Sequence, residues 1–444
     1  MSDSKPESLK VLLNLLKRFL QGESGIFEDS FRQDTFVYHY YMEIIRYWSK
    51  LNFIIRKTQR ALKLKSNLHF AETACLLYAT YRIFWEGAPN DEIQKEITLP
   101  HSEIKPILEK IPSFSWEIAL KNKSEEEKLS ILEAFPTFFI KRLNKVMSLD
   151  QLKMELKSLN NKPKQGEFTV FIKKEVSQVL DMCFINRLQR NINQNTPIFK
   201  VDEHLPFLYH VSAKFLPEIL SSELYLSGDL IILDKASAAV VEVFQPKKNR
   251  LILDMCAAPG IKTSLISHLT NKCASIFAND FSKKRSITMK GIVEKLQNPQ
   301  MHLINSDGIL LPLRNEERMD QILLDAPCTG SGALYTNPEL KWRQSREFLY
   351  QNVTLQEKLL DSALNYLKPS GILVYSTCSL YPEEGEYQIQ KFIDRLIPMQ
   401  LPSWMSSSYP IDGKNIPGTA RLFPSTHHCE GFFIGKFKKK EKYN

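Results

Sequence analysis

From about residue 236 onward, short apolar runs alternate with segments that are long enough to form helices. The runs read RLILDMC, ASIFAND, DQILLDA, GILVYST and GFFIGKF. Because parallel strands need long crossover connections, this alternation favours an α/β fold with a mostly parallel sheet and helices on both faces. Ligands bind such sheets beyond the carboxyl ends of the strands. The polar residues that close the runs are therefore the first candidates for a functional site.

The length of the chain, 444 residues, predicts two or three domains. Residues 1–145 carry apolar residues at helical spacing, as in LKVLLNLLKRFL, and predict an all-α domain in which EGAPNDE ends one helix and starts another. Residues 146–235 mix strand-like EFTVFI and DLIILD with helix-like EVSQVLDMCFINRLQRNI, and LKSLNNKPKQGE is the best linker candidate. Residues 236–444 form the predicted α/β domain.

Charge and cysteine content narrow the class of protein. A net charge of +9 favours an anionic partner, nucleic acid before membrane. The seven cysteines are odd in number and lack Cys-x-x-Cys spacing, which fits a reducing compartment better than a disulfide framework. No run reaches the length of a membrane span, and the polar start MSDSKPESLK lacks a signal-peptide core. We therefore expect a cytoplasmic protein without a membrane partner.

The first apolar run leads into the sequence LDMCAAPGIKT. Small residues, then Pro259 and Gly260, predict a tight turn that admits a ligand close to the backbone at a helix N-terminus. The spacing matches neither a Walker loop nor Gly-x-Gly-x-x-Gly. Asp280 closes the next run about 20 positions later, which suits a ribose hydroxyl pair, and Asp307 follows a third run. Each of these lone aspartates could equally cap a helix or a turn.

Two further strand ends carry thiols. The segment DAPCTGSG places Asp325 three residues before Cys328, and YSTCSLYPEEGE carries Cys378. Cysteine supplies some thiolate near neutral pH and is intrinsically nucleophilic, so paired thiols at neighbouring strand ends indicate covalent catalysis. The alternative is that both are buried small hydrophobic residues. From the residues alone, the pattern does not say which thiol attacks. The THHC run at 426–429 has no second ligand pair nearby, so no metal site is expected.

In this order, DMCAAPGIKT, DAPCTGSG and YSTCSLYPEEGE resemble the RsmB/Sun family of RNA (cytosine-5) methyltransferases. The closing segment RLFPSTHHCEGFFIGKF resembles that family too. The resemblance is strong from about 225 to 438 and weaker from 135 to 225. The first 130 residues loosely resemble the helical, NusB-like domain of some members. The resemblance implies a Rossmann-like, S-adenosylmethionine-dependent methyltransferase domain.

The resemblance also implies roles for the strand-end residues. Cys378 would attack carbon 6 of cytosine and Cys328 would assist product release, while Asp325 would contact the cytosine edge and Lys262 would orient Asp325 or the cofactor. DNA cytosine methyltransferases, however, place the attacking cysteine in a Pro-Cys motif, which makes Cys328 a competitor. The cofactor S-adenosylmethionine would be held by Cys256, Ala257, Ala258, Pro259, Gly260, Ile261 and Lys262, together with Asp280, Asp307 and Asp325.

The chain departs from the family pattern at four places. Ile261 stands where the family usually has a second glycine, and Leu233 replaces a glutamine in LDKAS. Gly385 replaces the Asn of Glu-Asn-Glu, and TVFIKK lacks the Arg and Asn of an earlier family strand. These departures bear on substrate contacts more than on the chemistry.

The target base must leave its stack to reach a thiol, so single-stranded or loop RNA is the expected partner. We favour rRNA over tRNA because of the helical front domain, which would position RNA together with residues 146–235, and we expect a monomer. Two alternatives stay open: a non-catalytic RNA-binding ribosome assembly factor that retains the fold, and a methyltransferase acting on a small molecule or a protein.

Overall fold

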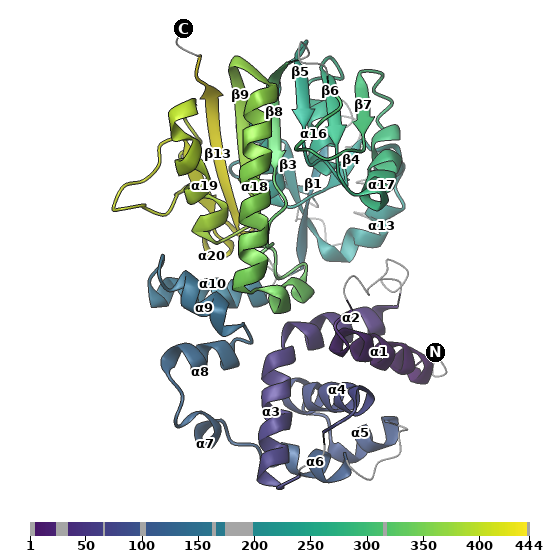
Figure 1. The fold of residues 1–444 in the computed structure, drawn as a ribbon. Helices are drawn as coiled ribbons and strands as arrows, with labels where there is room; N and C mark the ends of the chain where they lie inside the picture. The colour runs from purple at the N-terminus through teal and green to yellow at the C-terminus, as the bar shows by residue number, and fades with distance from the viewer. Residues whose placement is uncertain are drawn as a thin grey trace. The chain divides into compact units, whose positions relative to one another are not determined.

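The computed structural model describes residues 5–23, 34–64, 67–97, 104–161, 166–173, 199–313 and 318–441. The chain divides into two compact units (Figure 1). Unit 1 comprises residues 1–156 and 334–345, and unit 2 comprises residues 157–333 and 346–444. The predicted helix at 175–192 and part of the predicted linker lie outside the described residues. Within the described ranges, no helix is long and apolar enough to cross a membrane.

Unit 1 is helical, as its sequence pattern predicts. The spacing of Leu9, Leu12 and Leu16 places all three in the core of this unit. The break predicted at EGAPNDE is confirmed, because one helix ends at Glu86 and the next begins at Asn90. The helices are α1 (Lys5–Leu20), α2 (Thr35–Arg46), α3 (Trp48–Ala61), α4 (Phe70–Glu86), α5 (Asn90–Glu96), α6 (Lys105–Lys110), α7 (Trp116–Leu120), α8 (Glu125–Leu132) and α9 (Thr137–Leu143). Helix α10 (Leu149–Asn160) begins in unit 1 and ends in unit 2.

A segment from the later part of the chain, residues 334–345, belongs to unit 1. It forms the short helix η4 (Pro338–Arg343). The Trp342 indole donates to the Ile45 carbonyl over 2.6 Å, and the Arg46 guanidinium lies 4.3 Å from the centre of the Tyr335 ring. Aromatic side chains bury large areas, so their burial anchors this segment among the helices. The chain thus leaves unit 2 after Ala333 and returns to it at Arg346.

Unit 2 begins with a small antiparallel sheet. Its strands follow the order β2-β3-β1-β4, with bounds β1 (Glu167–Ile172), β2 (Phe199–Val201), β3 (Leu208–Ser212) and β4 (Leu230–Ile232). The short helices α13 (Leu216–Leu220) and α14 (Glu223–Ser227) lie between β3 and β4 in the chain. EFTVFI and DLIILD are therefore strands, as predicted. Helix α10 continues to Asn160, so regular structure extends into the predicted linker.

The larger sheet of unit 2 has nine strands and carries the candidate site. Its order is β11-β12-β13-β9-β8-β5-β6-β7, with β10 paired to β13. The bounds are β5 (Leu251–Asp254), β6 (Ser275–Asn279), β7 (Met301–Ile304), β8 (Met319–Asp325), β9 (Leu367–Thr377), β10 (Leu396–Pro398), β11 (Ser406–Ser407), β12 (Thr419–Leu422) and β13 (Phe432–Lys439). Strands β5 to β9 pair in parallel, whereas β13 runs antiparallel to β9. The mostly parallel α/β prediction is confirmed.

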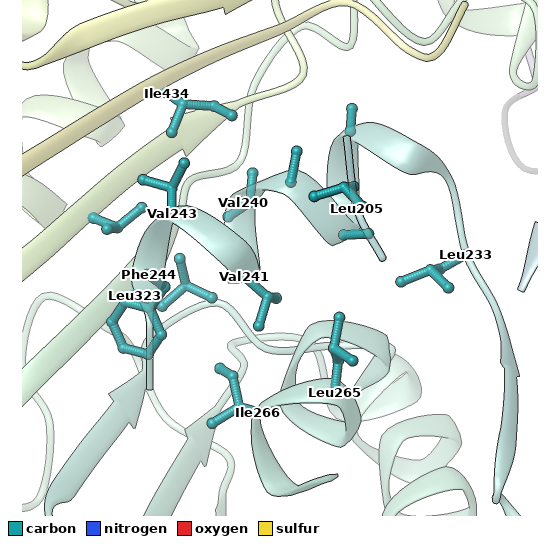
Figure 2. Packing of buried hydrophobic residues seen from close by; sticks show 14 of the residues in the cluster. Leu205, Leu233, Val240, Val241, Val243, Phe244, Leu265, Ile266, Leu323 and Ile434 are labelled. Carbon is teal, nitrogen blue, oxygen red and sulfur yellow. The ribbon is translucent and has the colours of Figure 1, made fainter. Parts of the chain in front are cut away.

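Helices cover both faces of this sheet, as parallel crossovers require. They are α15 (Lys235–Phe244), α16 (Ile261–Leu269), α17 (Lys283–Glu294), α18 (Arg346–Tyr366) and α19 (Glu386–Phe392), with the short α20 (Pro424–His427) before β13. Successive residues of β8 point to opposite faces of the sheet and pack in two different hydrophobic cores. Leu323 packs with α15 and α16, while Ile322 and Leu324 pack with α18. Figure 2 shows part of the first core, where side chains of α15 meet those of α16, β8 and β13. A register slip of one residue would exchange these faces, so the alternation fixes the register.

The strand order reverses between β5 and β8. From β5 the chain proceeds through β6 to β7 on one side, and β8 and β9 follow on the other side. Such a reversal leaves a crevice beyond the carboxyl ends of the two central strands. Asp254 ends β5 and Asp325 ends β8, so the predicted motifs meet at this position.

Candidate active site

The turn after β5 is built around a glycine. Gly260 has φ +102°, a backbone conformation that side chains disfavour, and it forms the N-cap of α16. A Cβ at this position would lie 3.1 Å from Cγ of Met289, which is tighter than ordinary contact. The Gly260 amide donates to the Ala257 carbonyl over 2.8 Å. The predicted tight turn at a helix N-terminus is therefore present.

A buried carboxyl group, which the sequence pattern did not single out, lies directly beneath this turn. Asp254 is 1% exposed and accepts a hydrogen bond from the Thr263 hydroxyl over 2.7 Å. Burial raises the pKa of Asp254 to about 7, although the hydrogen bond from Thr263 acts in the opposite direction. Asp254 closes its strand as Asp280 and Asp325 close theirs, and this shared position is the signal that could have identified it.

Asp280 and Asp307, the two aspartates predicted to contact the cofactor, have different surroundings. Asp280 follows β6 and is 4% exposed, and its carboxylate accepts from the amides of Ala258 and Ser282 over 3.2 and 2.9 Å. Each carboxylate oxygen has two lone pairs, so Asp280 can still accept from a ligand hydroxyl. Asp307 is exposed and accepts from the Ile309 amide over 2.9 Å, as a turn residue does. The structure thus places Asp280 in the cradle and Asp307 at its exposed margin.

At the end of β8, Asp325 is held from two sides. Its Oδ2 lies 2.7 Å from the Lys262 ammonium, and its Oδ1 accepts from the Ser376 hydroxyl over 2.7 Å. Lys262 belongs to the first turn of α16 and Ser376 to β9, so three elements converge on one carboxylate. Burial alone would lower the pKa of Lys262, but the adjacent Asp325 carboxylate raises it above its usual value.

The two predicted cysteines meet. The sulfur atoms of Cys328 and Cys378 lie 3.0 Å apart, and both cysteines are free and half-buried. The hydrogen bond with Cys378 raises the pKa of the Cys328 thiol well above its usual value, and burial acts in the same direction. Cys378 in turn interacts electrostatically with the Lys262 ammonium. The pair is therefore asymmetric, with Cys328 holding its proton and Cys378 lying near a fixed positive charge.

Close backbone packing fixes the loop that carries Cys328. A Cβ on Gly332 would lie 2.0 Å from the Gly431 carbonyl oxygen, so only glycine fits there. The Gly332 amide donates to the Cys378 carbonyl over 3.0 Å, and the Gly431 amide donates to the Gly332 carbonyl over 2.9 Å. The glycines of TGSG and CEG therefore allow the two loops and the start of β13 to approach one another.

Three residues that depart from the family pattern lie in buried or half-buried positions of unit 2. Gly385 is buried, and a Cβ there would lie 2.7 Å from the Phe433 ring. Leu233 is 6% exposed in the core with α15, and its amide donates to the Thr169 carbonyl over 3.2 Å. Ile261, the first residue of α16, is half-buried against the same core. The residues at 385 and 233 therefore serve packing.

The cradle fits a nucleoside-type cofactor. Its residues Ala257 and Ala258 carry only small side chains, and its left-handed Gly260 packs closely against Met289 and Val293 of α17. Asp280 offers acceptors for hydroxyl groups, and the first amides of α16 offer donors for a carboxylate. S-adenosylmethionine carries a ribose and a carboxylate, so its chemistry matches this donor set. Among the described residues, no cluster of three or more His, Cys, Asp or Glu side chains is suited to hold a metal ion.

The sheet order, the cradle and the paired thiols define the class: a Rossmann-like methyltransferase domain with a two-cysteine site. Residues 241–438 match the family model described as 16S rRNA methyltransferase RsmB/F. This part of the chain is therefore similar to the RsmB/F family, and the resemblance predicted from the motifs is confirmed. The cofactor predicted from the sequence, S-adenosylmethionine, is that of this family.

Individual relatives agree with this assignment. The chain is 34% identical over 227 residues to a mouse 28S rRNA (cytosine-C(5))-methyltransferase, with 48% of the chain and 28% of the relative covered. It is 32% identical over 224 residues to a probable ribosomal RNA small subunit methyltransferase B of Synechocystis, with 48% and 49% covered. The chain thus spans about half the length, or less, of these relatives. The crystal structure of PH0851 shares the fold, with a TM-score of 0.75, 23% identity and 98% and 99% of the two chains covered.

Proposed function

We propose that this protein is an S-adenosylmethionine-dependent RNA cytosine-5 methyltransferase that forms 5-methylcytosine through a covalent cysteine–cytosine adduct. The observation that carries the proposal is the pair of thiols 3.0 Å apart beside the Lys262–Asp325 ion pair, at the strand-order reversal of the sheet. A methyltransferase acting on a simple nucleophile would not need two thiols at this position. Both named relatives are rRNA methyltransferases, and rRNA is our proposed substrate.

Cys378 is the proposed nucleophile. Its thiolate would bond to carbon 6 of cytosine, which makes carbon 5 electron-rich. The Lys262 ammonium stabilises negative charge at this sulfur, whereas the raised pKa of Cys328 keeps that thiol protonated. Asp325 would hold the cytosine edge, where a hydrogen bond or a proton at nitrogen 3 stabilises the adduct. When bound, S-adenosylmethionine supplies an electrophilic methyl group.

Cys328 is the proposed release residue. Once carbon 5 carries the methyl group, its proton must leave and the carbon–sulfur bond to Cys378 must break. A protonated Cys328 at 3.0 Å can donate its proton to the departing sulfur and accept the proton from carbon 5. The thiol pair then holds both protons and returns one to solvent. The same geometry thus serves attack and release with different sulfurs.

Unit 1 is the proposed RNA-positioning part. It contains a pocket of about 570 Å³ lined by residues of α1, α3 and α4, with the exposed Arg56 and Arg60 in its wall. Guanidinium groups bind phosphate oxygens well, and the net charge of +9 favours such a partner. A polar, arginine-lined pocket on a helical unit suits an RNA backbone better than an apolar ligand.

The decisive experiment incubates the protein with labelled S-adenosylmethionine and rRNA or tRNA, beside Cys378→Ala and Cys328→Ala. Label in 5-methylcytosine is counted, and denaturing gels reveal protein–RNA adducts. We expect Cys378→Ala to be inactive without an adduct and Cys328→Ala to accumulate one. Sedimentation of the same samples tests the expected monomer.

Other outcomes separate the alternatives. Reversed behaviour of the two variants would retain the reaction and exchange the roles of the thiols. Label that appears with tRNA alone would replace rRNA as the substrate. Cofactor binding without labelled cytosine in any RNA would contradict the proposal and favour a binding factor or another substrate.

A further inference from the structure

Glu384 connects the neighbours of both thiols. Its carboxylate accepts from the Thr329 amide over 2.9 Å and from the Thr329 hydroxyl over 2.5 Å. Its backbone carbonyl accepts from the Thr377 hydroxyl over 3.2 Å. Thr329 follows Cys328 in the chain, and Thr377 precedes Cys378. One residue therefore bonds to the positions adjacent to each sulfur.

Further hydrogen bonds hold Glu384 in place. The Gln356 side chain of α18 donates to the Glu384 carboxylate over 3.0 Å and to the Pro327 carbonyl over 2.9 Å. The Tyr375 hydroxyl donates to the Glu384 carbonyl over 2.8 Å. Glu384, Gln356 and Thr329 are each 0% exposed. Buried polar groups with several partners have one arrangement, so this network fixes the loop of Cys328 with respect to β9.

We propose that Glu384 is a positioning residue that keeps the Cys328 sulfur within reach of the Cys378 sulfur. The inference rests on the proposed function, because the two thiols need this contact only if they act in sequence. It deepens that function by assigning the release step to a three-part unit of Glu384, Thr329 and Cys328. A carboxylate suits the position because it accepts at both oxygens from a threonine that offers two donors. The charge of Glu384 also favours the protonated form of the Cys328 thiol.

Two substitutions at one site separate position from charge. In Glu384→Gln the amide oxygen can still accept from the Thr329 amide, and the Thr329 hydroxyl can accept from the new NH₂ group. Glu384→Ala removes every side-chain contact. We expect Glu384→Ala to accumulate the RNA adduct as Cys328→Ala does, with turnover lowered on the order of 100-fold. Glu384→Gln should retain most of the turnover, and cofactor binding should be unchanged in both.

The control is Glu357→Ala, which removes a glutamate of α18 whose side chain is 50% exposed and pairs with Lys391. It should leave the adduct and the turnover unchanged. A purely structural role for Glu384 would instead lower adduct formation and turnover in parallel, and that result would overturn the proposal.

A second measurement needs neither RNA nor activity. Diamide oxidises two neighbouring thiols to a disulfide: each thiol loses one proton and one electron, and diamide becomes the hydrazine. Mass spectrometry of peptides would follow the closing of the bond between Cys328 and Cys378. We expect rapid closing in the wild type and in Glu384→Gln, and closing roughly tenfold slower in Glu384→Ala because the effective concentration of one thiol at the other falls.

The rate of disulfide formation distinguishes the positioning role of Glu384 from the proposed function. If the wild type makes no 5-methylcytosine but Glu384→Ala slows the closing, the positioning role stands and the proposed function fails. Equal closing rates in the wild type and Glu384→Ala would overturn the positioning role even in an active enzyme. Should Glu384→Ala fail to fold, Thr329→Val tests the same link from its other end, and it should also slow closing and accumulate adduct. Unchanged closing and release in Thr329→Val would contradict the proposal.

Discussion

Each unit of this protein holds a lysine that is largely withdrawn from water, Lys262 in unit 2 and Lys341 in unit 1, and these two lysines have opposite electrostatic settings. Lys262 in unit 2 lies 2.7 Å from the Asp325 carboxylate, which raises its pKa. Lys341 in unit 1 is 0% exposed, donates to the Arg46 carbonyl over 2.9 Å, and lies 3.8 Å from the centre of the Phe135 ring. Burial and the nearby Arg46 charge lower the pKa of Lys341 well below its usual value.

The difference shows how the units use buried polar groups. In unit 2 the partly buried ammonium of Lys262 is paired with the Asp325 carboxylate, and it interacts electrostatically with Cys378. In unit 1 the buried amine satisfies a helix carbonyl and fills space among aromatic rings, so it joins residues 334–345 to the helices. Burial of a lysine alone is thus no sign of a functional site, and the partner of the ammonium decides its role.

The largest expected effect concerns Lys262. Replacing it with Met removes the cation beside Cys378 and leaves the Asp325 carboxylate without its ammonium partner. Turnover should fall on the order of 10³-fold, about 4 kcal/mol of transition-state stabilisation. Lys262→Arg should recover part of the loss. The measurement is single-turnover labelling of RNA. If the Lys262→Met enzyme were as fast as the wild type, Lys262 would have no catalytic role that distinguishes it from Lys341.

The next effect concerns the buried carboxyl group of Asp254, whose folded-state pKa of about 7 lies above its ordinary value of 3.8. The folded state therefore holds the proton more tightly, so this group stabilises the fold below pH 4 and that stability is lost as the pH rises to 7. The slope is at most roughly 1.4 kcal/mol per pH unit. Asp254→Asn should flatten the dependence of the unfolding free energy on pH over this window. A slope identical to that of the wild type would show that Asp254 does not titrate there.

The matched effect in unit 1 concerns Lys341 and has the opposite sign. Its lowered pKa means that the unfolded chain binds the proton more tightly, so stability rises as the pH approaches the unfolded value of 10.5. Thermal unfolding of the wild type should show this gain as the pH rises toward 10.5, and Lys341→Met should lose it. RNA methylation per folded molecule should fall far less than in Lys262→Met. A comparable loss would mean that unit 1 supports the chemistry directly.

The smallest effect concerns RNA binding by unit 1. Arg56→Ala and Arg60→Ala should each weaken RNA affinity several-fold and lower the slope of log affinity against log salt by about one, because one phosphate contact is lost. Cofactor binding should be unaffected. Affinity measured at three salt concentrations checks the prediction, with Lys290→Ala, an exposed lysine of α17 in unit 2, as the control. Equal loss in the control would indicate a general charge effect.

Much of the fold was predictable because the signals are local. The runs that become β5, β6, β8, β9 and β13 are apolar and closed by polar residues, so their place in an α/β sheet follows from periodicity. The all-α character of unit 1 follows from helical spacing in the same way. By contrast, residues 334–345 lie within the predicted α/β domain in sequence, and only packing assigns them to unit 1. Their aromatic side chains indicate burial, but the sequence does not name the elements that bury them.

The features of the candidate site also separate into those that local sequence predicts and those that depend on tertiary contacts. By itself, the sequence determined which residues close or follow the strands: Asp325, Cys328 and Cys378, with Lys262 just after the turn that begins the next helix. Strand ends are local features, and parallel strands bring their carboxyl ends to one edge. Only the tertiary structure decided that the two sulfur atoms lie 3.0 Å apart and that Glu384 forms hydrogen bonds with the residues next to both cysteines. It also decided that Gly332 packs so closely against the Gly431 backbone that a side chain would not fit. These contacts join residues far apart in the chain, and they depend on strand order and register, which no local pattern encodes.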